Sequence, residues 1–243
     1  MKYIPNFITC LNLTSGFFGI ILAVQGHLLL ASWLIVAAMI FDFLDGFSAR
    51  MLKAYSELGK ELDSLADVIS FGIAPGIIMF HLLYDALSLS VPMDTDTLGT
   101  RTFLLLMIPA LMPVCAALRL AKFNLDSTQT SIFKGMPTPA NAIAVVTLVF
   151  TTNHTDFQAL NSFIISPLSL AVFTIILSLL MITRLPLLSL KMSNFYLKGN
   201  EGRYIMIVLL LAFLLLFGLK SLPFIIPLYI LSSLVQFYII DRK

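Results

Sequence analysis

The chain alternates between long apolar stretches and short polar breaks, a pattern typical of a polytopic α-helical membrane protein. A helix needs about 20 mostly apolar residues to cross the hydrocarbon core of a bilayer. Glycine and proline mark several of the breaks, as at Gly26, Pro92 and Gly135. The pattern predicts eight spanning helices, the fifth and seventh being short, at residues 6–24, 28–50, 57–84, 102–122, 138–153, 163–183, 204–219 and 223–240.

Composition agrees with this all-α membrane helix bundle. Of the 243 residues, 59% are hydrophobic and only 12% are charged, which is more apolar surface than a soluble domain of this length can bury. We therefore expect one membrane domain over residues 1–243, surrounded by lipid. The net charge of +2 gives no reason to expect nucleic-acid binding. Cys10 and Cys115 fall in apolar segments, so we expect buried packing residues rather than a disulfide or a metal site.

The basic residues predict the orientation. With eight spans, all of the 15 lysines and arginines except Arg101 and Lys220 fall on one side of the membrane. Cytoplasmic loops carry such an excess of basic residues. The N- and C-termini are therefore expected in the cytoplasm, with the protein in the cell (inner) membrane.

Four aspartates lie where charges are expensive, near the cytoplasmic ends of the second and third helices. Asp42 and Asp45 are in the stretch 42-DFLDGFSAR-50, and Asp63 and Asp67 share one face of the next helix because they are four residues apart. If the two helices are antiparallel neighbours, all four carboxylates reach one depth, where they cannot all stay ionised without compensation. Carboxylate oxygens without histidine or cysteine favour Mg²⁺ or Mn²⁺, so we expect a site for one or two such ions.

Small and polar residues surround these aspartates on matching helix faces: Gly46, Ala49, Arg50, Gly59, Thr9 and Asn12. Small side chains leave room for a bulky ligand beside the metal, and an arginine is suited to phosphate. We therefore expect these residues to line a diphosphate site that opens to the cytoplasm and borders lipid.

Other interpretations of the same residues are open. Single aspartates near helix ends can be merely interfacial, and small residues often serve helix packing in membranes. Intramembrane prenyltransferases also use aspartate clusters with Mg²⁺, but their clusters lie far apart in sequence. An ion or metal transporter is a non-enzyme alternative, although paired broken helices in matching halves are not evident.

The motif Asp42-x-x-Asp45-Gly46-x-x-Ala49-Arg50, followed after residues 51–58 by Gly59-x-x-x-Asp63-x-x-x-Asp67, resembles the complete signature of the CDP-alcohol phosphotransferases. The match covers residues 42–67. The stretches 4-IPNFITCLNLTSGFFGI-20, 70-SFGIAPG-76, 119-RLAKFN-124 and 133-FKGMPTPANA-142 are similar to the branch of this family whose alcohol is serine.

The resemblance implies an enzyme that transfers a phosphatidyl group from CDP-diacylglycerol to L-serine and releases CMP. It also implies that the four aspartates hold a two-metal centre and that Asp67 is the general base. The glycines, Ala49 and Arg50 would line the CDP pocket. Related enzymes that use a phosphorylated alcohol, such as glycerol phosphate or inositol phosphate, are the alternative within the family.

The choice of alcohol must come from outside the shared motif. The carboxylate of serine needs a cation, and Arg119, Lys122 and Lys134 are the candidates because they lie near the cytoplasmic end of the fourth helix and in the following loop. Ordinary cytoplasmic flanking charge is the alternative for each of them. Arg119 is favoured because it lies furthest inside the helix. The sequence leaves the oligomeric state open between a monomer and a homodimer.

Overall fold

The computed structural model describes residues 3–89, 99–125, 133–153, 164–183, 185–187, 201–218 and 224–237. The first half of the chain forms four long, nearly continuous helical runs, and the third of these contains a π-helix, η1. The elements in order are α1 (Tyr3–Val24), α2 (Leu28–Met51), α3 (Glu57–Asp67), η1 (Val68–Ile73) and α4 (Ala74–Ala86). They are followed by α5 (Thr100–Met107), the 3₁₀-helix η2 (Ile108–Ala110) and α6 (Leu111–Leu125).

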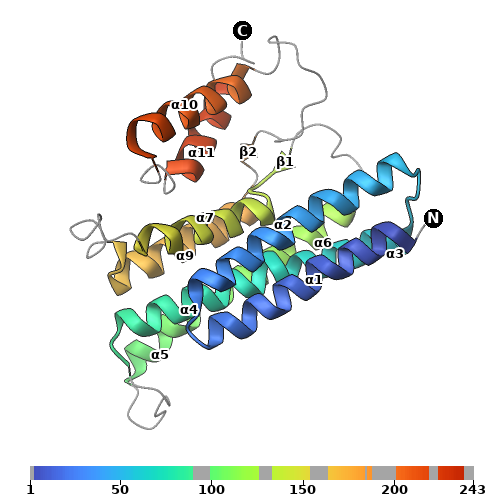
Figure 1. Cartoon of the computed structure of the whole chain (residues 1–243). Helices are drawn as coiled ribbons and strands as arrows, with labels where there is room; N and C mark the ends of the chain where they lie inside the picture. Colours follow the sequence, from blue (N-terminus) through green and yellow to red (C-terminus); the bar gives the residue numbers. More distant parts are fainter. Residues whose placement is uncertain are drawn as a thin grey trace.

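The second half contains shorter helices and one small sheet. Its elements are β1 (Phe133–Lys134), α7 (Thr138–Thr152), α9 (Pro167–Ile182), β2 (Pro186–Leu187), α10 (Glu201–Phe217) and α11 (Ile225–Val235). The α10–α11 pair lies to the left of β1 and β2 in Figure 1, while α7 and α9 lie beside the long helices. The two-residue antiparallel strands pair Phe133 with Leu187, an element that the hydrophobic pattern did not predict.

All eight predicted helical segments have a counterpart among the described residues, although residues 163, 219, 223 and 238–240 of the predicted spans lie outside them. Among the described helices, four runs are long and apolar enough to cross a membrane: Tyr3–Val24, Leu28–Met51, Glu57–Ala86 and Thr100–Leu125. Three apolar helices in the second half are shorter than the usual span. The structure is therefore consistent with a membrane helix bundle, and the count of eight spans stays a prediction.

Helix α1 is the centre of the packing in the first half of the chain. It lies along α2 and also contacts α3, η1 and α4, whereas α2 and α3 hardly touch one another. Small residues allow the close approach: a Cβ added at Gly16 would lie 2.8 Å from the Ser70 Cα atom, and one at Gly19 would lie 3.6 Å from the Ala31 carbonyl oxygen. The aspartate-bearing helices are thus held by a third helix rather than by direct packing.

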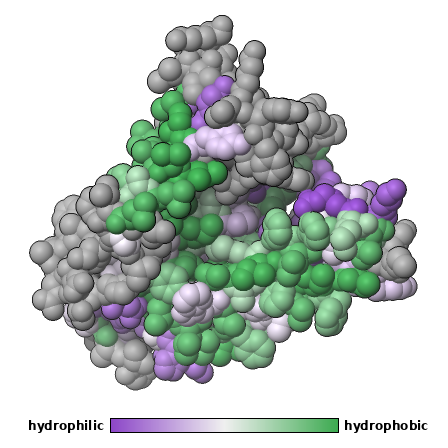
Figure 2. All heavy atoms as spheres, turned by 45° about the horizontal axis from the view of Figure 1, so that its top comes forward, coloured by the Kyte–Doolittle hydropathy of each residue, from purple (hydrophilic) through white to green (hydrophobic). Residues whose placement is uncertain are grey.

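Large apolar side chains cover the outside of the long helices, as expected where lipid replaces water (Figure 2). Phe7, Phe17 and Trp33 are among the exposed ones. Cys10 is exposed on α1, so the expectation that it is buried was wrong, whereas Cys115 is buried. The apolar pattern alone does not separate the two cases, because a membrane helix is apolar on its lipid face as well as on its packed face.

Candidate functional site

Three of the four aspartates converge. Asp42 on α2 and Asp63 and Asp67 on α3 each offer a carboxylate oxygen, and these oxygens lie within 4.8 Å of one another. The Oδ1 atoms of Asp63 and Asp67 are buried and have no hydrogen-bond partner among the described residues. Buried carboxylate oxygens are normally satisfied, so this arrangement is one that a bound cation would complete.

The start of α3 brings its aspartates to the depth of Asp42. The chain leaves α2 at Met51 and begins α3 at Glu57, where Ser56 is the N-cap and accepts a hydrogen bond of 3.0 Å from the Gly59 backbone N–H. Asp63 therefore lies less than two turns, and Asp67 less than three turns, into a helix that begins where α2 ends.

Asp45 lies beside this group rather than in it. Its Oδ2 atom accepts a hydrogen bond of 2.7 Å from the Thr9 hydroxyl, and Thr9 Oγ1 also lies 3.0 Å from the carbonyl oxygen of Pro5 on its own helix. Both side chains are buried. The sequence placed all four carboxylates together, but it had no means of showing that α1 supplies a partner for one of them.

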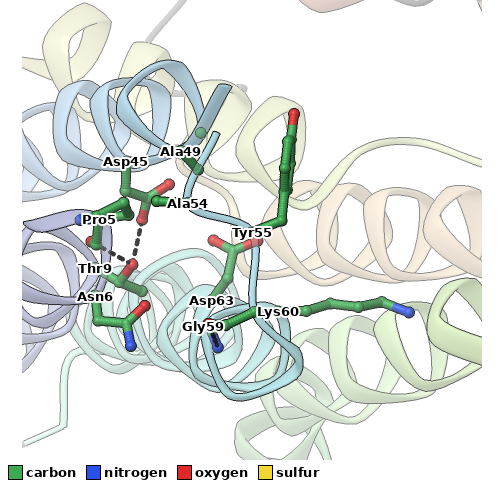
Figure 3. A pocket seen from close by; sticks show the side chains of 12 residues that line it. Pro5, Asn6, Thr9, Asp45, Ala49, Ala54, Tyr55, Gly59, Lys60 and Asp63 are labelled. Atoms are coloured by element: carbon green, nitrogen blue, oxygen red, sulfur yellow. Dashed lines mark hydrogen bonds between the residues drawn. The ribbon is translucent and has the colours of Figure 1, made fainter. Parts of the chain in front are cut away.

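An open cavity of about 210 Å³ adjoins the aspartates between α1, α2 and α3. Figure 3 shows the carboxylates of Asp45 and Asp63 directed into the same space, with the Lys60 amine directed away from it. The residues that line the cavity are Pro5, Asn6, Thr9, Asp45, Gly46, Ala49, Ala54, Tyr55, Ser56, Gly59, Lys60 and Asp63. The cavity exists because α2 and α3 are held apart by α1.

The two glycines of the signature face this cavity in different ways. Among the described residues, a Cβ added at Gly46 would have only the Arg50 Nη1 atom near it, at 3.8 Å, so this face is open. A Cβ at Gly59 would lie 2.8 Å from Asn6 Oδ1 and 3.0 Å from Ser56 Oγ. Gly46 therefore leaves room for a ligand, while Gly59 also lets the side chain of Asn6 approach α3.

The remaining predicted CDP-lipid residues occupy three different environments. Thr9 and Ala49 line the cavity. Arg50 is exposed, and its side chain lies near Gly46. Asn12 is 0% exposed and does not line the cavity; its two side-chain polar atoms have no partner among the described residues. Asn12 lies about one turn further along α1 than Thr9, on its buried face, and its predicted contact with the CDP-lipid stays a prediction.

The predicted serine-binding residues are also separated. Arg119 on α6 is only 9% exposed, its Nε atom has no partner among the described residues, and its charge interacts with that of Asp67. Lys122, three residues further on, is exposed. Lys134 belongs to β1, but its side chain lies outside the described part of the structure. Of the two cations whose side chains are described, Arg119 is thus the one brought to the aspartates.

Sequence reasoning missed Thr138, which starts α7 and donates a hydrogen bond of 3.2 Å to Asp67 Oδ2. The residue lies within the stretch 133-FKGMPTPANA-142, which was noted for its family resemblance but given no role. A proline on each side of Thr138 predicts a helix start. No local signal indicates that this start packs against an aspartate 71 residues away.

The donor atoms fit a hard divalent cation. The group that the described residues form has three carboxylates, two of them with an unpartnered oxygen, and neither histidine nor cysteine, which is the ligand chemistry that Mg²⁺ or Mn²⁺ prefers.

Comparison with known proteins gives one family over nearly the whole chain. The family model described as CDP-alcohol phosphatidyltransferase matches residues 2–231. A CDP-diacylglycerol–serine O-phosphatidyltransferase of Helicobacter pylori is 31% identical over 98% of this chain and 92% of its own length. The enzyme of the same name from Bacillus subtilis is 32% identical over 76% of this chain and 89% of its own. An archaetidylserine synthase of Methanothermobacter thermautotrophicus is 30% identical over 64% of this chain and 61% of its own.

Proposed function

The chain belongs to the CDP-alcohol phosphatidyltransferase family, and from this premise we propose that it transfers a phosphatidyl group from CDP-diacylglycerol to L-serine. The products are phosphatidylserine and CMP. The observation that carries the proposal is the convergence of Asp42, Asp63 and Asp67 beside an open cavity lined by small residues. The names of the two bacterial relatives, which this chain matches over most of its length, support serine as the alcohol.

The aspartates would hold one or two Mg²⁺ or Mn²⁺ ions, with Asp42, Asp63 and Asp67 as the first ligands and Asp45 as the fourth carboxylate at the cavity wall. Such ions neutralise diphosphate oxygens and stabilise the leaving nucleotide. Gly46, the open position of the cavity floor, gives the diphosphate of the CDP-lipid room to lie next to them.

The remaining chemistry belongs to the side chains. Asp67 takes the proton of the serine hydroxyl. The serine oxygen forms a bond to the phosphorus that bears the diacylglycerol, and the bond from that phosphorus to the CMP oxygen breaks. Arg119 binds the serine carboxylate and keeps the hydroxyl close to Asp67, with whose charge its own interacts. Arg50, which is exposed, meets the diphosphate at the mouth of the cavity.

The proposed orientation in the membrane follows from the end of the helix bundle at which the site lies. Because Asp42 and Arg50 lie near the end of α2, and Thr138 begins α7, the site lies at one end of the helices. The distribution of basic residues favours the cytoplasm for this end. We therefore propose eight spans, both termini in the cytoplasm of the cell and an active site that takes serine from the cytoplasm and CDP-lipid from the bilayer.

The deciding experiment measures CMP release by the purified protein with CDP-diacylglycerol and a panel of alcohols, in the presence of Mg²⁺, Mn²⁺ or a chelator. We expect release with L-serine, none with chelator, and little with glycerol 3-phosphate or inositol phosphate. Release with a phosphorylated alcohol but not with serine would refute the proposed substrate. CDP-archaeol in place of CDP-diacylglycerol tests the lipid, since one relative is named for an archaeal lipid.

The alternative classes are separated by the same preparation. Cation flux in proteoliposomes without CMP release would indicate a transporter. Pyrophosphate release from a prenyl diphosphate would indicate a prenyltransferase. The Asp63→Ala variant is the matched negative control, because Asp63 is both in the aspartate group and in the cavity wall.

A further inference from the structure

The first turn of α7 contacts Asp67 through a buried threonine. Thr138 is 0% exposed, and its hydroxyl donates to Asp67 Oδ2 at 3.2 Å. The other carboxylate oxygen, Oδ1, is buried without a partner among the described residues. One oxygen of Asp67 is thus held by the protein, and the other is left for a cation or for the substrate.

The same helix also holds the turn that follows Asp67. Helix η1 begins at Val68, directly after the aspartate, and a π-helix interrupts the regular α-helical hydrogen bonding; such turns are frequent at functional sites. Asn141, one turn after Thr138 on α7, donates its Nδ2 hydrogen to the carbonyl oxygen of Phe71 within this turn, at 3.2 Å. Two side chains of α7 therefore fix the chain on the two sides of the junction between α3 and η1.

The start of α7 is itself anchored away from the aspartates. The Met136 backbone N–H donates to the carbonyl oxygen of Leu180 at 2.9 Å, and the Gly135 N–H donates to that of Leu185 at 3.0 Å. Gly135 has a φ of +85°, and a Cβ there would lie 2.5 Å from the Met181 carbonyl oxygen. The start of α7 is thus held by the end of α9 and by Leu185 beyond it, in addition to its contacts with α3 and η1.

We propose that Thr138 is a positioning residue for Asp67, which it holds in one rotamer so that Oδ1 is presented to the oxygens of Asp42 and Asp63. The effect of Thr138 on catalysis rests on the proposed function, whereas its effect on the affinity for a divalent cation does not. Loss of a partner that orients a metal-binding carboxylate typically lowers the metal affinity or the activity by about 10- to 100-fold. A residue that only packs the start of α7 would affect stability alone.

The test compares Thr138→Val with Thr138→Ser, because valine keeps the shape and loses the donor, whereas serine keeps the donor. Thr151→Val is the matched control: Thr151 is a buried threonine on the same helix, and its hydroxyl donates to the Thr147 carbonyl oxygen at 2.7 Å. Binding of Mn²⁺ to each purified protein is followed by electron paramagnetic resonance without substrate. The melting temperature, kcat and the KM values are measured alongside.

We expect Thr138→Val to weaken Mn²⁺ binding by about 10-fold or more and to lower kcat by a similar factor. The KM for serine should change little, and Thr138→Ser should restore both Mn²⁺ binding and kcat to within about threefold of the original chain. Thr151→Val should bind Mn²⁺ normally. If Thr138→Val does not purify as a folded protein, Thr138→Ala is assessed by the same criteria.

Unchanged Mn²⁺ affinity in Thr138→Val, or in its alanine substitute, overturns the proposal. So does an equal loss in Thr138→Ser, because the hydroxyl would then not be the group that matters. The proposed function fails separately: if the original chain releases no CMP with serine while Thr138→Val still weakens Mn²⁺ binding, the substrate assignment is wrong and the positioning role stands.

Discussion

Replacing Arg119 by lysine tests whether this buried cation selects the alcohol. Arg119 is 9% exposed on α6, and its charge interacts with that of Asp67. A guanidinium can bind a carboxylate through two parallel N–H groups, whereas a lysine offers a single ammonium on a flexible chain. Arg119→Lys therefore keeps the positive charge beside Asp67 and removes the planar two-point contact.

The size of the effect follows from one lost charge-assisted hydrogen bond. Such a bond contributes about 1.5–3 kcal/mol, which corresponds to a roughly 10- to 100-fold loss in kcat/KM for serine. Little discount for solvent screening is needed, because Arg119 is buried. The KM for CDP-diacylglycerol should change by less than about twofold, since the CDP cavity is formed by α1, α2 and α3 rather than by α6.

The assay measures CMP release against serine concentration at saturating CDP-diacylglycerol, and then the reverse. Arg101→Lys is the matched control, because Arg101 is exposed at the other end of the same α5–α6 run. Ethanolamine lacks the carboxylate, so it should be a poor substrate that Arg119→Lys does not make worse. Unchanged serine kinetics in Arg119→Lys would refute the reasoning. A lower kcat/KM for serine in Lys122→Met would then indicate that Lys122 binds the serine carboxylate.

Three further predictions concern the aspartates, the cavity and the anchor of α7. Each of the four signature aspartates, when replaced by alanine, should lower the rate of CMP release by several orders of magnitude, since members of one catalytic unit are not additive; near-normal turnover in any of them contradicts a shared cluster. Gly46→Leu should block CDP-lipid binding, measured by equilibrium competition, whereas Gly46→Ala should retain it, because only Arg50 Nη1 lies near an added Cβ; equal binding by both would mean that this glycine only packs helices. Gly135→Ala should lower the free energy of unfolding by about 1–3 kcal/mol, seen as a lower melting temperature in detergent, because alanine is strained at its φ of +85°. Gly99→Ala is the control, because no atom of the described part of the chain lies within 4 Å of the added Cβ, and equal melting temperatures would contradict the strain argument.

The helices could be predicted well from the sequence because their signal is local. Apolar length and glycine or proline breaks predicted 57–84 and 138–153, and the structure has helical runs at Glu57–Ala86 and Thr138–Thr152. The spacing of Asp63 and Asp67 likewise follows from the helix repeat alone. The hydrophobic pattern did not predict the π-helix at Val68–Ile73, because the apolar stretch continues through this segment without a break.

The candidate site was predicted in part, because the sequence shows which residues share a helix face but not which helices pack together. The sequence identified the aspartates and grouped all four, whereas the structure brings three within 4.8 Å and pairs Asp45 with Thr9. It also put Asn12 beside the ligand because Asn12 shares a helix face with Thr9, yet of these two residues Thr9 alone lines the cavity. A shared face gives the direction of a side chain but not the depth at which a neighbouring helix covers it.

The sequence by itself therefore determined which segments are helical, which residues carry the charge, and that Asp63 and Asp67 share a face, because each of these depends on residues within a few turns of one another. Only the tertiary structure decided that α1 separates α2 from α3 and so opens the cavity, and that Thr138 holds Asp67 across 71 residues of chain. Contacts of this kind depend on how helices approach one another in space. That approach is set by small residues such as Gly16 and by backbone hydrogen bonds such as that from Met136 to Leu180, which leave no periodic trace in the sequence.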